Sequence, residues 1–137
     1  MTPRRTPNRP SPGDWNDYLA RAEEFVESAR EALALSDGDA RAKVAAGNAI
    51  RAAIAFGDAV TVNKLGVTNT RDHAALPALV ATAAGKSVEA SQIARLGRIL
   101  SRKNQADYGA SPWRRVDAER LIQDVERFAA WVRALLR

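Results

Sequence analysis

The sequence predicts an all-α protein, an up-down bundle of four long helices and one short helix. The first reason is composition: 46% of the 137 residues are hydrophobic, mostly Ala, Leu, Val and Ile, and only 6% are aromatic. Such chains are typical of bundles in which small side chains let helices approach closely. The second reason is periodicity, because apolar residues recur at three- and four-residue steps and no sustained alternating run indicates a strand.

The first thirteen residues differ from the rest of the chain. They contain four prolines and three arginines, and after Met1 they hold no sizeable apolar residue. We therefore expect residues 1–13 to be a disordered basic tail and residues 14–137 to form one helical domain. Asp14 is the predicted N-cap of the first helix, which continues to about Leu35. Its predicted core stripe is Trp15, Leu19, Ala22, Phe25, Val26 and Ala29.

The middle of the chain predicts one long helix and one short helix. A turn at residues 36–39 precedes a helix over residues 40–65, which Gly66 ends as a C-terminal glycine. The short helix is expected over residues 71–84. Pro77 lies inside this segment, so either the helix starts late or it kinks there.

Two more long helices complete the predicted bundle. Ser87 is the predicted N-cap of a helix that runs to about Ala106, and residues 108–110 form a loop. Ser111 and Pro112 fit the N-cap and the first position of a helix that continues to the C-terminus. Its apolar stripe consists of Val116, Leu121, Ile122, Val125, Phe128, Ala129, Val132, Leu135 and Leu136.

Composition argues against several kinds of site. The chain has no cysteine, so neither a disulfide framework nor a thiolate metal site is expected. A single histidine argues against a histidine-based zinc site, and we expect no metal and no cofactor. No apolar segment is long enough for a transmembrane helix, and no apolar stretch follows the N-terminal arginines as in a secretory signal. We therefore expect a cytoplasmic protein without a membrane partner.

The positive charge admits two interpretations. The net charge is +5, the pI is about 10.2, and arginine far outnumbers lysine, which favours bidentate contacts to phosphate or carboxylate. The candidate phosphate-binding residues are Arg95, Arg98, Arg102, Lys103, Tyr108, Arg114 and Arg115. Alternatively these cations form an ordinary solvated face. In that case Glu119, Asp124 and Glu126 pair with some of them.

Asp58 is the most unusual acid in the chain. It is the only charged residue between Arg51 and Lys64, on an otherwise apolar helix. A carboxylate in such a place needs a partner or stays protonated, and the candidate partners are Arg51, Arg102 and the Tyr108 hydroxyl. One hypothesis is a polar cluster in a cleft between helices, made of Asp58, Arg102, Asp107 and Tyr108. The other is a buried ion pair that sets the helix register without any ligand.

The order of several segments resembles the HEPN family of helical domains, in particular its small actinobacterial members. The matching segments are Ala55–Val60, Leu65-Gly66, Asp72-His73, Arg102–Gly109 and a final amphipathic helix. The similarity extends roughly over residues 15–136. It implies a HEPN-like bundle, and it also implies a homodimer.

The resemblance also implies a ribonuclease motif that works without metal, in which an arginine is followed after four to six residues by a histidine. An imidazole would accept the proton of the ribose 2′-hydroxyl, and a guanidinium would stabilise the phosphorane. Arg102 fits the second role. Asp107 stands where the histidine is expected, and a carboxylate is a weak base that repels phosphate. His73 is either a displaced base or a residue that caps the short helix.

We therefore expect a HEPN-like module that binds RNA or a partner protein and is non-catalytic or weakly catalytic. By resemblance, its setting would be a toxin–antitoxin or phage-defence system. One alternative is a metal-independent ribonuclease that uses Arg102 and His73, with Asp107 as the third candidate catalytic residue. The other is a helical adaptor that binds proteins and has no nucleic-acid role.

Overall fold

The computed structural model describes residues 8–10, 13–69, 72–107 and 112–137, and it is mostly helical, which confirms the all-α class. The helices are α1 (Trp15–Ala34), α2 (Ala42–Leu65), α3 (Leu76–Ala84), α4 (Ala90–Ser101), α5 (Lys103–Asp107) and α6 (Arg115–Leu135). The shorter elements are the 3₁₀ turns η1 (His73–Ala75) and η2 (Gly85–Ser87) and the strands β1 (Asn8–Pro10) and β2 (Val67–Asn69).

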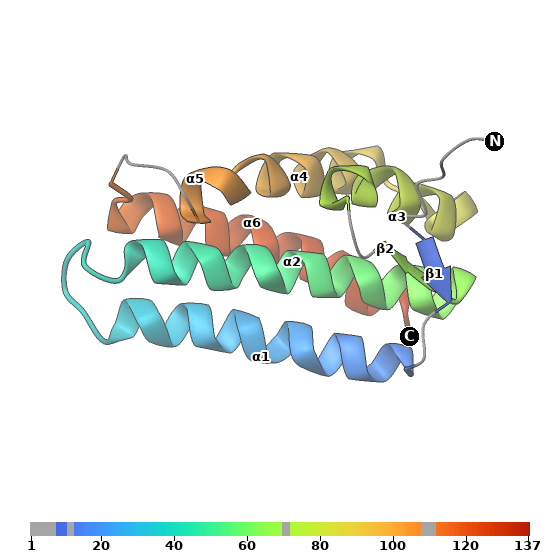
Figure 1. Ribbon diagram of the computed structural model, residues 1–137, viewed down its shortest axis with the longest axis horizontal. Coiled ribbons are helices and arrows are strands. Elements are labelled where there is room, and N and C mark those ends of the chain that lie inside the picture. The colour runs from blue at the N-terminus through green and yellow to red at the C-terminus, as the bar shows by residue number, and fades with distance from the viewer. Residues whose placement is uncertain (1–7, 11–12, 70–71, 108–111) are drawn as a thin grey trace.

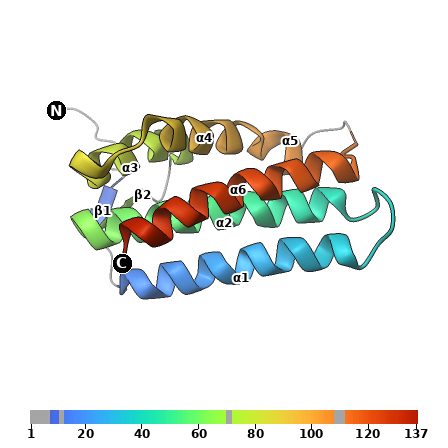
Figure 2. The same cartoon turned by 180° about the vertical axis from the view of Figure 1, so that it is seen from behind.

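The helices pack around α2, and the four longest helices, α1, α2, α4 and α6, alternate in direction along the chain (Figure 1). α1 lies along one side of α2, and α3, α4 and α5 lie along the other side. α6 covers the far face, where Figure 2 shows it crossing in front of α2. The prediction of four long helices is wrong in one respect, because the expected fourth helix is divided into α4 of 12 residues and α5 of 5 residues.

The core is centred on α2, because neighbouring helices cover most of its circumference. Its buried positions are mainly alanine and glycine, with Ile50 and Phe56 as the largest buried side chains. Small residues of this kind let α1, α3 and α6 approach the α2 backbone closely. The helix ends at Gly66, which has the left-handed φ of 71° that the predicted C-terminal glycine requires.

The structure confirms the predicted cap of α1 and shows which of the two alternatives for the short helix is correct. Asp14 caps α1, since the backbone N–H of Asn16 donates to its Oδ1 at 3.0 Å. Pro77 lies in the first turn of α3, where its missing N–H costs no helical hydrogen bond. The short helix therefore starts late instead of kinking.

Two other predicted helix starts are wrong. Ser87 does not cap a helix but lies in η2, because Gly85 turns the chain at φ 58° and its carbonyl accepts from the N–H of Val88 at 3.2 Å. α4 begins three residues later. The last helix begins at Arg115 and not at Pro112; the Asp117 carboxylate accepts from the N–H of Arg114, the N-cap residue, at 3.2 Å.

The break between α4 and α5 occurs at Arg102. The N–H of Arg102 donates to the carbonyl of Ile99 at 3.1 Å, which is the tighter spacing of a 3₁₀ turn, and the next helix begins at Lys103. The break makes the predicted continuous helix from Ser87 to Ala106 wrong.

The N-terminal segment also departs from the prediction. Asn8–Pro10 pair antiparallel with Val67–Asn69, with Arg9 opposite Thr68, so these three residues of the predicted disordered tail form a strand. Residues 1–7 and 11–12 lie outside the described residues. The pair sits at the end of the bundle where α2 finishes (Figure 1).

A pair of glycines tests how closely the helices pack. A Cβ at Gly57 would lie 2.9 Å from Leu76 Cδ2 and 3.2 Å from Leu76 Cγ, and Leu76 is fully buried. We expect Gly57→Ala to lower the free energy of unfolding by about 1–2 kcal/mol, because overpacking outweighs the better helix propensity of alanine. Urea denaturation measures the change.

Gly97→Ala is the matched control, since a Cβ there meets no described atom within 4 Å. It should leave the protein unchanged or stabilise it by up to about 1 kcal/mol. Equal effects of the two substitutions would contradict the close approach of α3 to α2.

Candidate functional site

Three adjacent pockets lie on one face of the bundle; two are lined in part by α2, and one lies between η1 with α3 and α4 with α5. The central pocket, of ≈350 Å³, is lined by Arg21, Phe25, Arg51, Ile54, Ala55, Asp58, His73 and Lys103. A second pocket of ≈350 Å³ shares His73 and Lys103 with it and extends over Ala74, Pro77, Gly97, Leu100, Ser101 and Asn104. A third, of ≈330 Å³, shares Arg51 and extends over Lys43, Val44, Gly47, Asn48 and Ala106.

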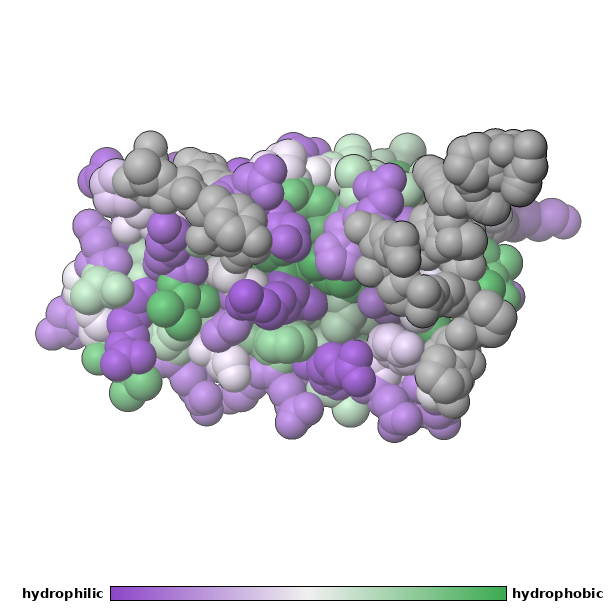
Figure 3. All heavy atoms as spheres, viewed as in Figure 1, coloured by the Kyte–Doolittle hydropathy of each residue, from purple (hydrophilic) through white to green (hydrophobic). Residues whose placement is uncertain are grey.

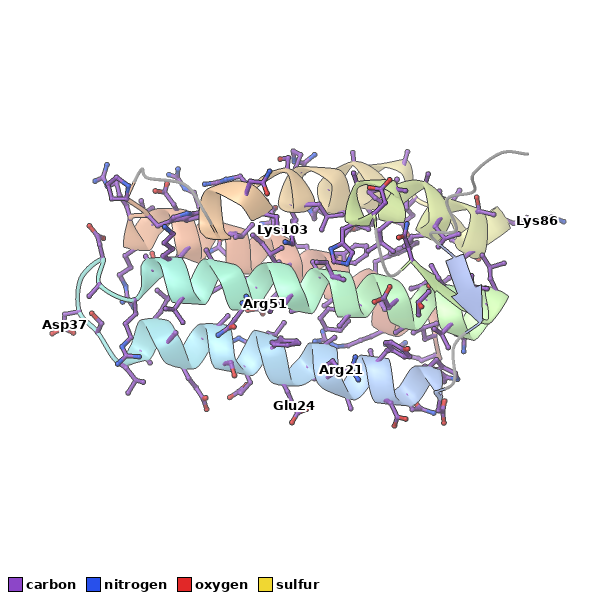
Figure 4. All side chains as sticks on the ribbon, viewed as in Figure 1. Arg21, Glu24, Asp37, Arg51, Lys86 and Lys103 are labelled. Carbon is purple, nitrogen blue, oxygen red and sulfur yellow. The ribbon has the colours of Figure 1, made fainter. Side chains whose placement is uncertain are left out.

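We call these three pockets together the basic groove. In Figure 3, the same face shows hydrophobic side chains at the bottom of a hollow that hydrophilic side chains surround. Figure 4 shows Arg21, Arg51 and Lys103 on this face, coming from α1, α2 and α5. Asp58 is the only acid among the described residues that line the groove.

Helical spacing explains why these residues meet. Arg51 and Asp58 are seven residues apart, two turns of α2, and Ile54 and Ala55 lie between them on the same face. Arg21 and Phe25 are one turn apart on α1, next to the buried Ala22–Val26 stripe. The edge of that stripe therefore faces the edge of α2 that carries Asp58.

Asp58 is mostly buried, and its Oδ1 accepts no hydrogen bond from any described residue. Burial raises the pKa of this carboxyl from 3.8 to about 7, and the positive charge of Arg21 opposes the shift only in part. At neutral pH the group is therefore divided between its neutral and charged forms. A buried, half-ionised carboxyl in a cleft is typical of functional sites, although structural clusters also produce it.

His73, at the start of η1, lies between the central pocket and the second one. Its pKa is lowered, first by burial and then by the charge of Lys103, while Asp72 opposes the shift. The imidazole is therefore neutral at pH 7. Asp72 also caps the turn by accepting from the N–H of Ala74 at 3.1 Å.

The structure does not bring Asp58 and Arg102 together. The Arg102 guanidinium lies over the Trp113 ring, 4.4 Å from its centroid, and Arg102 does not line any pocket of the basic groove. The charged neighbour of Asp58 is Arg21, which the sequence analysis did not consider. The predicted cluster of Asp58 with Arg102 is therefore wrong in its pairing. The Asp107 side chain and Tyr108 lie outside the described residues.

The structure also places the predicted phosphate-binding residues in different surroundings. Arg95 turns towards α6, where its Nε lies 3.5 Å from Asp124 Oδ1, and its Nη1 donates to Gln92 at 3.0 Å. Arg98 and Arg114 are exposed, and neither lines the groove. Of the predicted phosphate-binding residues that the structure describes, only Lys103 lines the groove.

Arg115 joins α6 to the end of α1. Its Nη1 donates to the carbonyls of Leu33 and Ser36, both at 2.7 Å, and its Nε lies 3.2 Å from the Glu119 carboxylate. The guanidinium thus satisfies carbonyls at a helix C-terminus, where positive charge is favourable. Its expected role in phosphate binding does not fit this position.

Three groove residues, Arg21, Lys43 and Arg51, are not among the phosphate-binding residues that the sequence predicts. The sequence indicates Arg51 only as a partner of Asp58, and no local pattern distinguishes Arg21 from other exposed cations. The contacts arise from helices distant in sequence, so helical spacing within α2 was the only signal that pointed to part of the group.

No group of three or more His, Asp and Glu side chains within the described ranges is arranged to hold a metal ion. No described helix is both long and apolar enough to cross a bilayer. Comparison with models of protein families gives no match to this chain, and comparison with curated proteins gives no significant match.

The raised pKa of Asp58 predicts how stability depends on pH. Between pH 4 and 7 the unfolded chain has released the Asp58 proton while the folded chain still holds it, so the free energy of unfolding falls as pH rises. Asp58→Asn removes this loss. It should stabilise the protein at pH 8 by up to about 4 kcal/mol, and the gain should vanish near pH 4.

Urea denaturation of both proteins from pH 4 to 8 measures the difference. Asp37→Asn, in the exposed loop between α1 and α2, makes the same change of charge far from the groove (Figure 4). A difference between wild type and Asp58→Asn that does not change with pH would contradict the raised pKa.

Proposed function

We propose that the basic groove binds the phosphate backbone of single-stranded RNA and that the protein is a binding module without catalytic activity. The observation that carries the proposal is a row of three adjacent pockets in which neighbouring pockets share lining residues. Cations from three helices, Arg21, Arg51 and Lys103, surround its central pocket, and Lys43 extends the positive charge along α2. Cations spaced along a groove neutralise successive phosphates, which supplies most of the affinity for a single strand.

The apolar lining of the groove favours binding of a nucleic-acid strand over binding of a counter-ion alone. Phe25 and Ile54 lie in the central pocket, and Leu100 and Pro77 lie in the next one. Bases lie on such surfaces while the backbone follows the cations. The HEPN resemblance, the homodimer and the defence-system setting remain predictions.

Substitution of groove cations tests the proposal. Arg51→Ala with Lys103→Ala should weaken binding to a fluorescein-labelled mixed-sequence RNA by about tenfold or more at low salt, because charge-assisted phosphate contacts are lost. The slope of log affinity against log salt should fall by about 1.4, since each phosphate contact on a single strand contributes about 0.7. Fluorescence anisotropy at several salt concentrations measures both.

Lys86→Ala is the matched control, because Lys86 is exposed at the opposite end of the bundle from Asp37 and does not line the groove (Figure 4). Arg4→Ala with Arg5→Ala measures the contribution of the N-terminal arginines. If Lys86→Ala lost as much RNA affinity as the groove variant, the effect would be due to net charge and not to the groove. Absence of RNA binding even at low salt would leave the adaptor alternative.

A metal-independent ribonuclease is the second candidate, favoured by a neutral His73 in the groove beside Lys103. An imidazole in this form accepts a proton from a ribose hydroxyl. The guanidinium expected to assist it, that of Arg102, lies over Trp113 instead. We therefore propose RNA binding as the first candidate function and RNA cleavage as the second.

Incubation with end-labelled RNA in EDTA separates the two candidates. We expect the RNA to remain intact over hours on a denaturing gel, because Arg102, the arginine expected to stabilise the phosphorane, lies over Trp113 and does not line the groove. Cleavage that disappears in both His73→Ala and Arg102→Ala would establish the ribonuclease instead. Cleavage that persists in both variants would indicate a contaminant.

A further inference from the structure

The central pocket of the groove is lined by three cations, Arg21, Arg51 and Lys103, and by the carboxyl group of Asp58. Arg21 affects Asp58 only through its charge, and Oδ1 of Asp58 has no hydrogen-bond partner among the described residues. If the acid were there to neutralise the arginines, the pocket would contain a direct ion pair, as Glu23 makes with Arg133 at 2.7 Å elsewhere in the bundle. The pocket is therefore arranged for a group that comes from outside the protein.

The charges of the pocket indicate the chemistry of that group. Asp58 is the only acid among the described residues that line the pocket, so with Asp58 neutral its charged lining consists of Arg21, Arg51 and Lys103, and His73 adds no charge in its neutral form. An anion with several acceptor oxygens fits between such cations. A protonated carboxyl adds one O–H donor, and a phosphate oxygen can accept this hydrogen bond. An ionised carboxylate would instead repel the phosphate.

We propose that the central pocket holds a phosphate group between its three cations, with a protonated Asp58 donating a hydrogen bond to a phosphate oxygen. This inference rests on the proposed function and assigns one subsite of the groove. Binding of the phosphate keeps the proton on Asp58, because a neighbouring anion disfavours the carboxylate. RNA binding is therefore coupled to proton uptake at this residue.

The coupling gives a pH dependence with a definite sign. The protonated fraction of a carboxyl with a pKa of about 7 falls from about 0.9 at pH 6 to about 0.1 at pH 8. If only the protonated form accepts phosphate, the affinity of wild type for a 5′-hydroxyl RNA oligonucleotide should fall about tenfold over this range. Phosphodiesters do not titrate in this range.

Asp58→Asn is the decisive variant, because its amide has the shape of the neutral acid and donates at every pH. It should bind the oligonucleotide with affinity constant to about twofold from pH 6 to 8. At pH 8 it should bind about tenfold more tightly than wild type. His73→Gln should retain the pH dependence, which separates Asp58 from the imidazole, and Asp37→Asn should follow wild type.

Two results would overturn the proposal. In the first, Asp58→Asn loses RNA binding at both pH values while Asp37→Asn binds normally. This result would mean that the ionised carboxylate itself accepts hydrogen bonds from the donors of a base. Asp58→Asn with the pH dependence of wild type would remove Asp58 from the site. In either case, loss of binding by the Arg51→Ala, Lys103→Ala variant would still support the groove, so the two proposals fail separately.

NMR titration of the Asp58 carboxyl in the wild-type protein does not depend on any substitution. Inorganic phosphate should raise the pKa of this group, and an unchanged or lowered pKa would contradict the hydrogen bond. A 5′-phosphorylated oligonucleotide distinguishes two sources of the phosphate. Tighter binding than its 5′-hydroxyl form assigns the pocket to a terminal phosphate, and equal binding assigns it to a phosphate within the strand; both support the subsite.

Discussion

The burial of α2 is the constraint on which the rest of the structure depends. This helix is covered by α1 on one side, by α3, α4 and α5 on the other, and by α6 on the far face. Only small residues over most of its length allow so many neighbours, and close contacts such as that of Gly57 with Leu76 follow. The positions of all other helices are set relative to this one.

The covered faces of such a helix have little tolerance for charge, and Asp58 places a mostly buried carboxyl group there. Placing a carboxyl there raises its pKa and reduces stability at neutral pH, because water is removed and no ion pair replaces it. Proteins retain features of this kind where they serve a site. In the proposed site, the cost in stability and the affinity for an anion would have the same physical origin, namely the low polarity around one carboxyl group.

The arginines of this protein have two different uses. Some hold helices together: Arg115 binds carbonyls at the end of α1, Arg133 forms a bidentate pair with Glu23 at 2.7 Å, and Arg95 faces Asp124. Others, such as Arg21 and Arg51, remain exposed along the groove. Net charge alone therefore says little about where an anion binds, because the cations that bridge helices are already paired.

Local patterns were sufficient for most of the helices and several of their ends, but not for the break between α4 and α5. The cap at Asp14, the glycine at Gly66 and most of the apolar stripes depend on residues three or four positions apart, which the sequence displays directly. Val116 is an exception in its stripe, because the structure leaves it 38% exposed. Local patterns also marked Asp58 as an acid in an apolar helix. The site partners could not be obtained in this way. Arg102 and Lys103 are adjacent, yet a break in the helix turns one to Trp113 and the other to the groove. Which cation reaches Asp58 depends on how α1, α2 and α5 pack, and that packing brings together residues that share no local pattern.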